Sequence, residues 1–168
     1  MNKFVTEPLN SKHKKSEFSC GKAMLDNYLH RQAKQDVKRK LSACFVLPSL
    51  PDNLIKGYYT LSNNSISYEI VPPNYQKRLP RAYSSIPTTL IGRLAIDNRF
   101  QGQGLGKILL VDALKRCYET SSIMGSYAVI VDPLDNDAED FYTKYGFIKL
   151  PDSAKMFIAI DTIKEFFK

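Results

Sequence analysis

The stretch Arg-Phe-Gln-Gly-Gln-Gly-Leu-Gly-Lys, at residues 99–107, decides the fold of this chain. Residues 90–96 before it have the apolar composition of a buried strand, and residues 108–114 after it have that of a helix. A glycine-rich turn between a strand and a helix presents free backbone N–H groups at the positive end of the helix dipole. The stretch therefore predicts a site for an anion, typically a phosphate or a pyrophosphate.

Two common glycine motifs do not fit this stretch. A P-loop would need glycine where Gln101 stands, and Ser or Thr where Ile108 stands. The dinucleotide fingerprint G-x-G-x-x-G would place its third glycine at Lys107. The pattern that remains, Gln101-x-x-Gly104-x-Gly106, resembles the acetyl-CoA-binding motif of the GNAT superfamily of N-acetyltransferases, in which this loop holds the CoA pyrophosphate. A glycine turn that only closes a strand is the alternative.

Length and composition indicate one folded domain. A chain of 168 residues predicts a single domain over residues 1–168, and a hydrophobic content of 43% excludes general disorder. No apolar run reaches the roughly eighteen residues of a membrane span, and the N-terminus lacks a signal-peptide core. The three cysteines, Cys20, Cys44 and Cys117, show no metal-type spacing, so we expect reduced thiols in a cytoplasmic protein.

The positive charge is concentrated in the first two thirds of the chain. Residues 1–40 carry a net charge of +6, residues 41–107 carry +4, and residues 108–168 carry −3. This asymmetry predicts a directed electrostatic field and an anionic partner, for which nucleic acid, CoA and an acidic protein are the candidates. A solvated basic face without a partner is the alternative.

The hydrophobic pattern predicts a mixed order of helices and strands. A helix capped by Ser19 is expected over about residues 21–38. Residues 72–87, with four prolines, are expected to form a loop with one helical turn. The other expected strands cover residues 42–47, 55–62, 88–96, 127–131, 147–150 and 155–160, and the other helical segments cover 104–120, 137–145 and 162–167. This order resembles the GNAT acyl-CoA N-acyltransferase fold, an α/β (α+β) architecture whose central mixed β-sheet is flanked by helices.

A second informative segment, Asp-Phe-Tyr-Thr-Lys-Tyr-Gly-Phe, occupies residues 140–147. Phe141 and Tyr145 are four residues apart and are expected to pack inward, whereas Tyr142 lies about 100° around the helix and need not share that face. The pattern Phe-Tyr-x-x-x-Gly-Phe resembles the GNAT segment whose tyrosine contacts the acetyl-CoA thioester. Asn136 resembles the polar residue that contacts the cofactor there. A purely structural Tyr142 is the alternative.

Acetyl transfer needs an amine nucleophile, a polarised thioester carbonyl and a proton for the departing thiolate. A tyrosine hydroxyl, with a reference pKa near 10, can supply the proton, so Tyr142 is the candidate catalytic residue. An α-amino group has a pKa of about 8, so a strong general base is dispensable. Backbone N–H groups around Leu94, Ala95 and Ile96 can hold the carbonyl oxygen. The two histidines of the chain suggest neither a zinc site nor a Ser-His-Asp triad.

Further segments narrow the resemblance. They are Phe-Ser-Cys-Gly at 18–21, Gly-Tyr-Tyr-Thr-Leu-Ser at 57–62, Leu-Pro-Arg at 79–81 and Ile-Gly-Arg-Leu-Ala-Ile-Asp at 91–97. Together they resemble the TacT-like GNAT toxins of type II toxin–antitoxin systems. The resemblance implies that acetyl-CoA is the co-substrate, that the α-amino group of aminoacyl-tRNA is acetylated, and that translation is thereby blocked. It also implies a ribbon-helix-helix antitoxin and a homodimer.

The resemblance and the charge pattern together define the candidate site residues. Those expected to bind acetyl-CoA are Leu94, Ala95, Ile96, Gln101, Gly102, Gln103, Gly104, Leu105, Gly106, Lys107, Asn136 and Phe141. Those expected to bind RNA phosphates are Arg31, Lys34, Lys38, Lys77, Arg78, Arg81 and Arg93. For Arg93, an ion pair with Asp97 or a neighbouring acid is the alternative. No metal is expected. Two other functions remain open: a GNAT acetyltransferase of a small amine or a protein N-terminus, and a CoA-binding module without catalysis.

Overall fold

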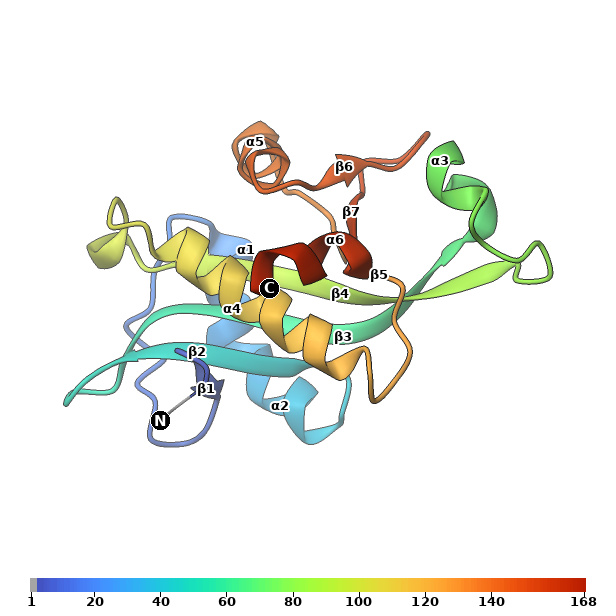
Figure 1. Ribbon diagram of the computed structural model, residues 1–168. Coiled ribbons are helices and arrows are strands. Elements are labelled where there is room, and N and C mark those ends of the chain that lie inside the picture. Colours follow the sequence, from blue (N-terminus) through green and yellow to red (C-terminus); the bar gives the residue numbers. More distant parts are fainter. Residues whose placement is uncertain (1–2) are drawn as a thin grey trace. The chain divides into compact units, whose positions relative to one another are not determined.

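The computed structural model describes residues 3–168, which form two compact units. The first unit contains the described residues up to 62 together with 91–113, and the second contains 63–90 and 114–168. Strands β3 (Leu54–Ser67) and β4 (Ser85–Ile96) and helix α4 (Leu105–Thr120) contribute residues to both units (Figure 1). The seven-stranded mixed sheet has the order β1-β2-β3-β4-β5-β7-β6, which confirms the predicted fold class.

Antiparallel pairing builds the sheet of the first unit. Strand β1 (Glu7–Pro8) pairs with β2 (Ala43–Ser49), and β2 pairs with the first part of β3. The β2–β3 register shifts between Leu47 and Pro48, where the proline lacks the N–H that a regular ladder requires. A two-residue strand such as β1 shows no alternation of its own, so the sequence pattern does not reveal it.

The helical segment after β1 has three consecutive parts. These are α1 (Ala23–Asn27), the π-helical segment η1 (Tyr28–Gln32) and α2 (Ala33–Lys38). The expected continuous helix over 21–38 is therefore interrupted by a wider turn. The expected Ser19 cap is wrong, because the helix begins at Ala23 and the Ser19 amide instead donates to Asp97 Oδ2 at 3.1 Å.

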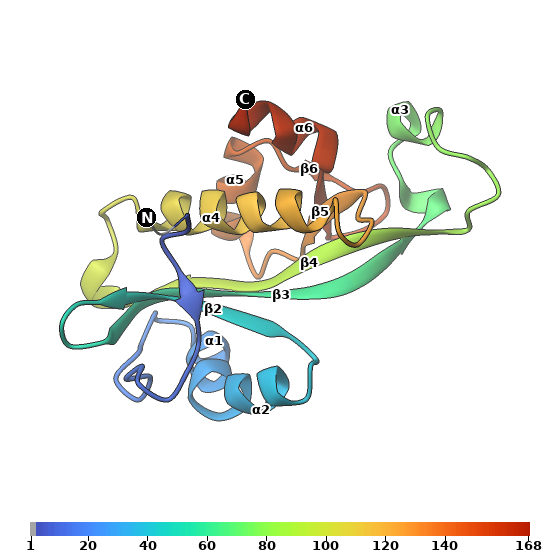
Figure 2. The ribbon, with the colours of Figure 1, turned by 60° about the horizontal axis from the view of Figure 1, so that its bottom comes forward.

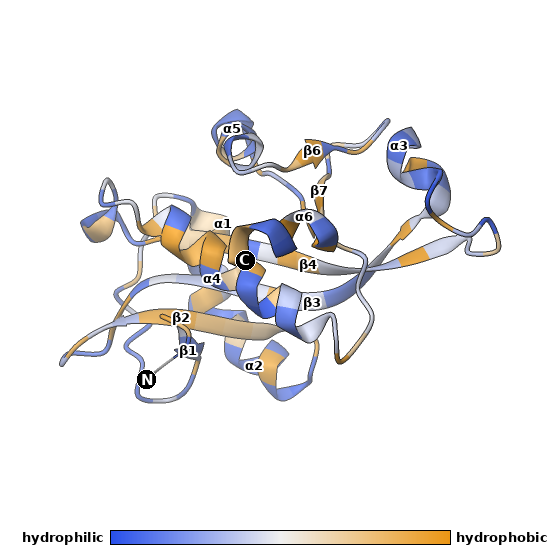
Figure 3. Cartoon of the chain, viewed as in Figure 1, coloured by the Kyte–Doolittle hydropathy of each residue, from blue (hydrophilic) through white to orange (hydrophobic). Residues whose placement is uncertain are grey.

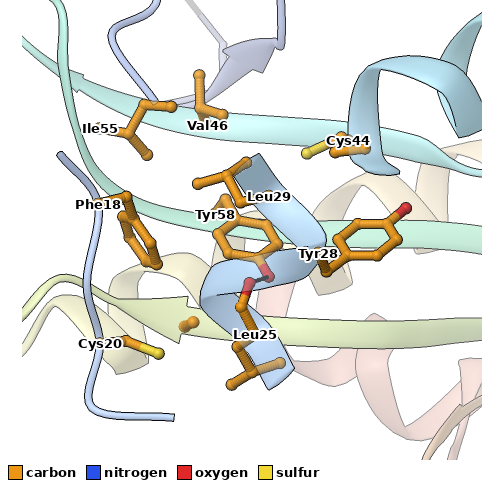
Figure 4. Packing of buried hydrophobic residues seen from close by; sticks show 11 residues of the cluster. Phe18, Cys20, Leu25, Tyr28, Leu29, Cys44, Val46, Ile55 and Tyr58 are labelled. Atoms are coloured by element: carbon orange, nitrogen blue, oxygen red, sulfur yellow. Dashed lines mark hydrogen bonds between the residues drawn. The ribbon is translucent and has the colours of Figure 1, made fainter. Parts of the chain in front are cut away.

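Helices α1 and α2 lie on one face of the first unit's sheet (Figure 2). The buried cluster beneath them includes Phe18, Leu25, Tyr28, Leu29, Cys44, Val46, Ile55 and Tyr58 (Figure 4). Strand β2 is hydrophobic along most of its ribbon, as this burial requires (Figure 3). The Tyr58 hydroxyl ties the helix to the sheet by donating to the Leu25 carbonyl at 2.7 Å.

The first turns of α4 lie on the opposite face. The Tyr59 hydroxyl donates to Asp112 Oδ2 of α4 at 2.7 Å. Gly57 permits the close approach, because a Cβ there would lie 2.7 Å from Ile96 Cδ1 and 2.8 Å from Leu109 Cδ1. A side chain at this position would push the start of α4 away from the end of β4, and the glycine therefore positions the loop between them.

The second unit completes the sheet. Its remaining elements are η2 (Tyr68–Ile70), α3 (Pro73–Gln76), β5 (Ala128–Val131), α5 (Asn136–Lys144), β6 (Ile148–Lys149), β7 (Met156–Ala159), α6 (Ile160–Lys164) and η4 (Glu165–Phe167). Strand β7 is antiparallel to both β5 and β6, which confirms the expected C-terminal strand pair. Helix α3 is the expected helical turn of the proline-rich segment, and its Tyr75 ring packs edge-on against Phe157 at 5.1 Å between centroids.

Several chemically reactive groups of the chain are buried in its packing. Cys20, Cys44 and Cys117 are free and buried. Burial raises the pKa of Cys20 to about 11 and the pKa values of Cys44 and Cys117 to about 12, so these thiols stay protonated and are poor nucleophiles. Across residues 3–168, no group of three or more His, Cys, Asp or Glu side chains could hold a metal ion. Within the same range no helix is long and apolar enough to cross a membrane.

Candidate active site

The glycine-rich loop of the first unit follows β4 and the short η3 turn (Asn98–Phe100). Gly102 and Gly104 have φ angles of 77° and 76°, a conformation that residues with a Cβ rarely adopt. A Cβ built at either position meets no heavy atom within 4 Å, so the loop surface is open at both glycines. The glycines are therefore required by the backbone conformation, and they leave the backbone accessible to a ligand.

The amide groups of this loop are not used by the protein. The first helical hydrogen bond of α4 runs from the Ile108 N–H to the Gly104 carbonyl at 3.4 Å. Within residues 3–168, no acceptor receives the amide hydrogens of residues 102–107. Free amides at the N-terminus of a 16-residue helix make a site for an anion, since the helix dipole adds to the hydrogen bonds. The backbone amides of residues 102–107 are thus free for the predicted anion.

Asp97 holds the base of the loop. Its carboxylate is almost fully buried and accepts hydrogen bonds from the Ser19 amide and from the amide, Nε and Nη2 of Arg99, at 2.8–3.1 Å. Burial alone would raise the pKa of Asp97, but the hydrogen bonds from Arg99 and Ser19 outweigh it and hold the pKa below its usual value. Asp97 therefore stays ionised and fixes the loop to residues 19–20.

Gln101 contributes its side chain to the same anchor. The Gln101 amide Nε2 donates to the Ile96 carbonyl at 3.0 Å and to the Cys20 carbonyl at 3.2 Å. The Asn98 amide donates to the Ser19 carbonyl at 2.7 Å. The side chain of Gln101, which the motif predicts to bind acetyl-CoA, is thus engaged in holding the loop to the end of β4.

The remaining loop residues of the prediction divide into exposed and half-buried positions. Gln103 and Lys107 are exposed, whereas Leu105 and Gly106 are half-buried at the start of α4. On β4 itself, Leu94 and Ile96 are half-buried, and Ala95 belongs to the buried cluster under α1. The structure therefore places all the predicted first-unit acetyl-CoA residues on one continuous strand–loop–helix segment.

Tyr142 is the buried residue of α5 in the second unit. Only 8% of its surface is exposed, and its ring packs edge-on against Phe141 and Phe147 at 5.2 Å between centroids. Phe141 and Tyr145, expected to pack inward, are half-buried and pack against each other at 5.1 Å between centroids. The tyrosine that the motif singles out is the one that the helix buries.

The Tyr142 hydroxyl is available for chemistry. In the described part of the chain it has no hydrogen-bond partner. Burial raises its pKa above the ordinary value of 10, so the hydroxyl is protonated throughout the physiological range. The hydroxyl oxygen is not among the buried side-chain atoms that lack a partner in the described residues, which are Thr60 Oγ1 and Thr88 Oγ1. The ring of Tyr142 is therefore buried, whereas its oxygen is accessible.

Local signals hold Tyr142 in place. Asp135 caps α5 by accepting the Ala138 amide at 2.9 Å. The helix ends at Lys144, and Gly146, two residues later, has a φ of 96°, which confirms the predicted left-handed cap. The Phe147 amide then donates to the Tyr142 carbonyl at 3.1 Å. Asn136, a predicted acetyl-CoA residue, is the exposed first residue of α5.

The predicted RNA-binding residues form one exposed set in each unit. Arg31, Lys34 and Lys38 are exposed along η1 and α2 of the first unit. Lys77, Arg78 and Arg81 are exposed after α3 in the second unit. The last residue of α3 is held by a hydrogen bond from Gln76 Nε2 to the Tyr68 carbonyl at 2.9 Å. None of these six side chains forms an ion pair within residues 3–168.

Arg93 does not pair with Asp97. Its guanidinium carbon lies 3.4 Å from the centroid of the Tyr28 ring, while the partner of Asp97 is Arg99. The ion-pair alternative for Arg93 is therefore wrong. The contacts of Arg99 with Asp97 and of Tyr28 with Arg93 could not be predicted from the sequence, because they depend on the fold and not on a motif.

Comparison with known proteins identifies the family. A family model described as an acetyltransferase (GNAT) domain matches residues 82–161. A protein of Mycobacterium tuberculosis named tRNA-acetylating toxin is 33% identical over 132 residues, 79% of this chain and 76% of its own length. A protein of Sinorhizobium fredii named probable toxin TacT is 30% identical over an alignment of 171 residues, which covers 96% of this chain and 94% of that protein.

Solved structures agree with these relatives over the whole length. AtaT complexed with acetyl-methionyl-tRNAfMet is 28% identical and has a TM-score of 0.90 over 98% of this chain and 99% of its own. A tyrosine-to-phenylalanine mutant of the AtaT toxin, bound to acetyl-CoA and the C-terminus of the antitoxin AtaR, is 26% identical with a TM-score of 0.82 over 99% of both chains. The chain belongs to the TacT-like toxins of the GNAT family and is an acetyl-CoA-dependent N-acetyltransferase.

Proposed function

We propose that this protein is a toxin that transfers acetyl from acetyl-CoA to the α-amino group of aminoacyl-tRNA and so blocks translation. The observation that carries the proposal is the full-length likeness to AtaT solved with acetyl-methionyl-tRNAfMet, in a chain whose glycine loop keeps its amides free. A blocked α-amino group cannot attack a peptidyl ester, which accounts for toxicity.

The first unit binds the anionic part of acetyl-CoA. The free amides of residues 102–107 donate to the pyrophosphate, and the dipole of α4 adds to this attraction. The loop is suited to the pyrophosphate because its open glycines admit a bulky anion at the backbone. The backbone of Leu94, Ala95 and Ile96 supplies N–H groups for the thioester carbonyl oxygen.

The second unit supplies the proton. Tyr142 gives its hydroxyl proton to the sulfur of CoA as the amine nitrogen attacks the thioester carbon and the carbon–sulfur bond breaks. Its raised pKa keeps the proton on the hydroxyl until the thiolate develops. The substrate α-amino group, with a pKa of about 8, is substantially neutral near pH 8 and needs no strong base. Asn136 and Phe141 contact the same co-substrate from α5.

The exposed basic residues bind the tRNA backbone. Arg31, Lys34 and Lys38 of the first unit and Lys77, Arg78 and Arg81 of the second donate to phosphates without reading sequence. The likeness to AtaT bound to AtaR supports an antitoxin as a further partner. We propose a ribbon-helix-helix antitoxin, a homodimer and action in the cytoplasm, where charged tRNA is used.

The test uses total charged tRNA, labelled acetyl-CoA and free amino acids as competing acceptors. We expect label on the amino acid esterified to tRNA and a rate that falls steeply with salt, since each phosphate contact adds about 0.7 to 0.9 to the slope of log affinity against log salt. Replacing Lys77, Arg78 and Arg81 with Gln lowers this slope. Replacing Lys149, Lys155 and Lys168, which form ion pairs within the chain, is the charge-matched control. Salt-insensitive acetylation of free amines would favour the small-amine alternative.

A further inference from the structure

Arg93 is a cation that the described chain leaves without an anion. It lies on β4 in the first unit, one residue before Leu94, and it is half-buried. In the described residues no carboxylate forms an ion pair with it, and no acceptor receives its N–H donors. Removing an arginine from water without a counter-charge is unfavourable, so such a residue is retained where a ligand supplies the negative charge.

The contact that Arg93 does make leaves its donors free. The guanidinium carbon lies 3.4 Å from the centroid of the Tyr28 ring, so the cation rests on the face of the aromatic ring. A guanidinium has five N–H donors in its own plane, and stacking on a ring uses the face and not these donors. The N–H groups of the Arg93 guanidinium, which can donate two parallel hydrogen bonds to one phosphate, therefore remain available.

Tyr28 is itself fixed on both sides. Its hydroxyl donates to Asp36 Oδ2 at 2.9 Å, and burial with the Asp36 bond raises its pKa to about 12, so the hydroxyl remains a donor. Its ring stacks parallel to that of Tyr58 at 6.5 Å between centroids, with the hydroxyl pointing away from Tyr58 (Figure 4). Tyr28 is also the first residue of the π-helical segment, a wider turn that often marks a functional position.

We propose that Tyr28 is a positioning residue whose ring holds the Arg93 guanidinium ready for a phosphate of the aminoacyl-tRNA. The inference rests on the proposed function. The CoA pyrophosphate is assigned to the free amides of residues 102–107, and we assign the RNA backbone to Arg93. The 3′-phosphate of CoA is the competing ligand, and it would show in the test as a raised KM for acetyl-CoA. Tyr28 acts only through Arg93 and touches no substrate.

The test compares Tyr28→Leu, Tyr28→Phe and Arg93→Gln in acetylation of charged tRNA at several salt concentrations. We expect Tyr28→Leu and Arg93→Gln each to raise the KM for tRNA several-fold and to lower the salt slope by about one contact, roughly 0.7 to 0.9. Tyr28→Phe keeps the aromatic face and is expected to stay near the parent enzyme. The KM for acetyl-CoA is expected to stay constant in all three.

The double variant Tyr28→Leu with Arg93→Gln separates positioning from structure. We expect it to match Arg93→Gln alone, because Tyr28 has nothing left to position. Additive losses, or a raised KM for acetyl-CoA in place of tRNA, would overturn the proposal. If Tyr28→Leu does not fold, Arg93→Gln and Tyr28→Phe are compared with the parent enzyme. Equal salt slopes in all three enzymes would contradict the proposal. A parent enzyme that does not acetylate charged tRNA overturns the proposed function as well, whereas an active parent with unaffected variants overturns this inference alone.

Discussion

Our proposal assigns different parts of the chemistry to the glycine loop of the first unit and to helix α5 of the second, and these two regions are built in opposite ways. The loop is exposed, and it acts through backbone amides that no acceptor in the described chain uses. Helix α5 presents one hydroxyl on a tyrosine that is only 8% exposed. The pyrophosphate of CoA is not changed by the reaction, so open, preorganised backbone amides are enough to bind it. A hydroxyl that gives up its proton acts more strongly when its ring is buried, because the surroundings then have a low dielectric constant. We therefore expect an added side chain in the loop to lower acetyl-CoA affinity, and we expect loss of the Tyr142 hydroxyl oxygen to lower the rate.

The largest expected effect is on α5. Replacing Tyr142 with Phe removes the hydroxyl and keeps the ring contacts with Phe141 and Phe147, so we expect kcat to fall by about 10²- to 10⁴-fold. Acetyl-CoA affinity by calorimetry and the melting temperature should stay near those of the parent. Tyr145→Phe, which removes a hydroxyl from the residue directly after the same helix, is the matched control. A variant at position 142 with a near-parental rate would make Tyr142 structural.

The next effect is on the loop. Gly104→Glu forces a side chain onto a backbone with φ of 76° and places a carboxylate where the pyrophosphate binds. We expect acetyl-CoA affinity to fall at least about tenfold by calorimetry, since strain at such a position alone costs about 1–3 kcal/mol. Gly125→Ala, at a glycine with open surroundings and no positive φ, is the control. Unchanged affinity in a folded Gly104 variant would remove the loop from the site.

A smaller effect is expected at the anchor of the loop. Asp97→Asn weakens the bonds from Arg99 and Ser19, and we expect a loss of about 1–3 kcal/mol in the free energy of unfolding with a few-fold rise in the KM for acetyl-CoA. The lowered pKa of Asp97 stabilises the folded state above its unfolded value of about 4, and this contribution is lost as the pH falls through the folded-state pKa.

Denaturant titrations at pH 7 and pH 3 check the sign of this effect. The difference in unfolding free energy between the parent and Asp97→Asn should be largest at pH 7 and should shrink at pH 3. Asp52→Asn, an exposed position of the same unit, should show no difference at either pH. If the difference in unfolding free energy between the parent and Asp97→Asn is the same at both pH values, the charge of Asp97 does not hold the loop.

The smallest expected change is in the pH profile. The rate should rise as the substrate amine loses its proton near pH 8 and then stay level, because the raised pKa of Tyr142 keeps the acid protonated beyond pH 10. We therefore expect one rising limb in kcat between pH 6 and about 10. A falling limb centred near pH 8 or 9, absent in Tyr142→Phe, would contradict the buried, protonated state of this hydroxyl.

The sequence by itself determined the elements whose signals are local. The run of residues 99–107 predicted the loop and the start of α4, because glycine spacing is a property of neighbouring residues. Gly146 predicted the end of α5 for the same reason. The charge pattern predicted where basic residues gather, and the motif around Tyr142 selected the catalytic candidate. The family resemblance, confirmed by the relatives, supplied tRNA, which composition alone could not name.

Tertiary structure alone decided which side chains meet across long separations in sequence. Asp97 accepts the Ser19 amide, Gln101 reaches the Cys20 carbonyl, and Arg93 rests on Tyr28, each over at least 65 residues of chain. The wider turn at residues 28–32 also departs from the 3.6-residue period of the sequence. Hydrophobic periodicity and turn chemistry report only on nearest neighbours along the chain. Contacts between distant segments depend on how the strands register and pack, and those choices are made by the free energy of the whole fold.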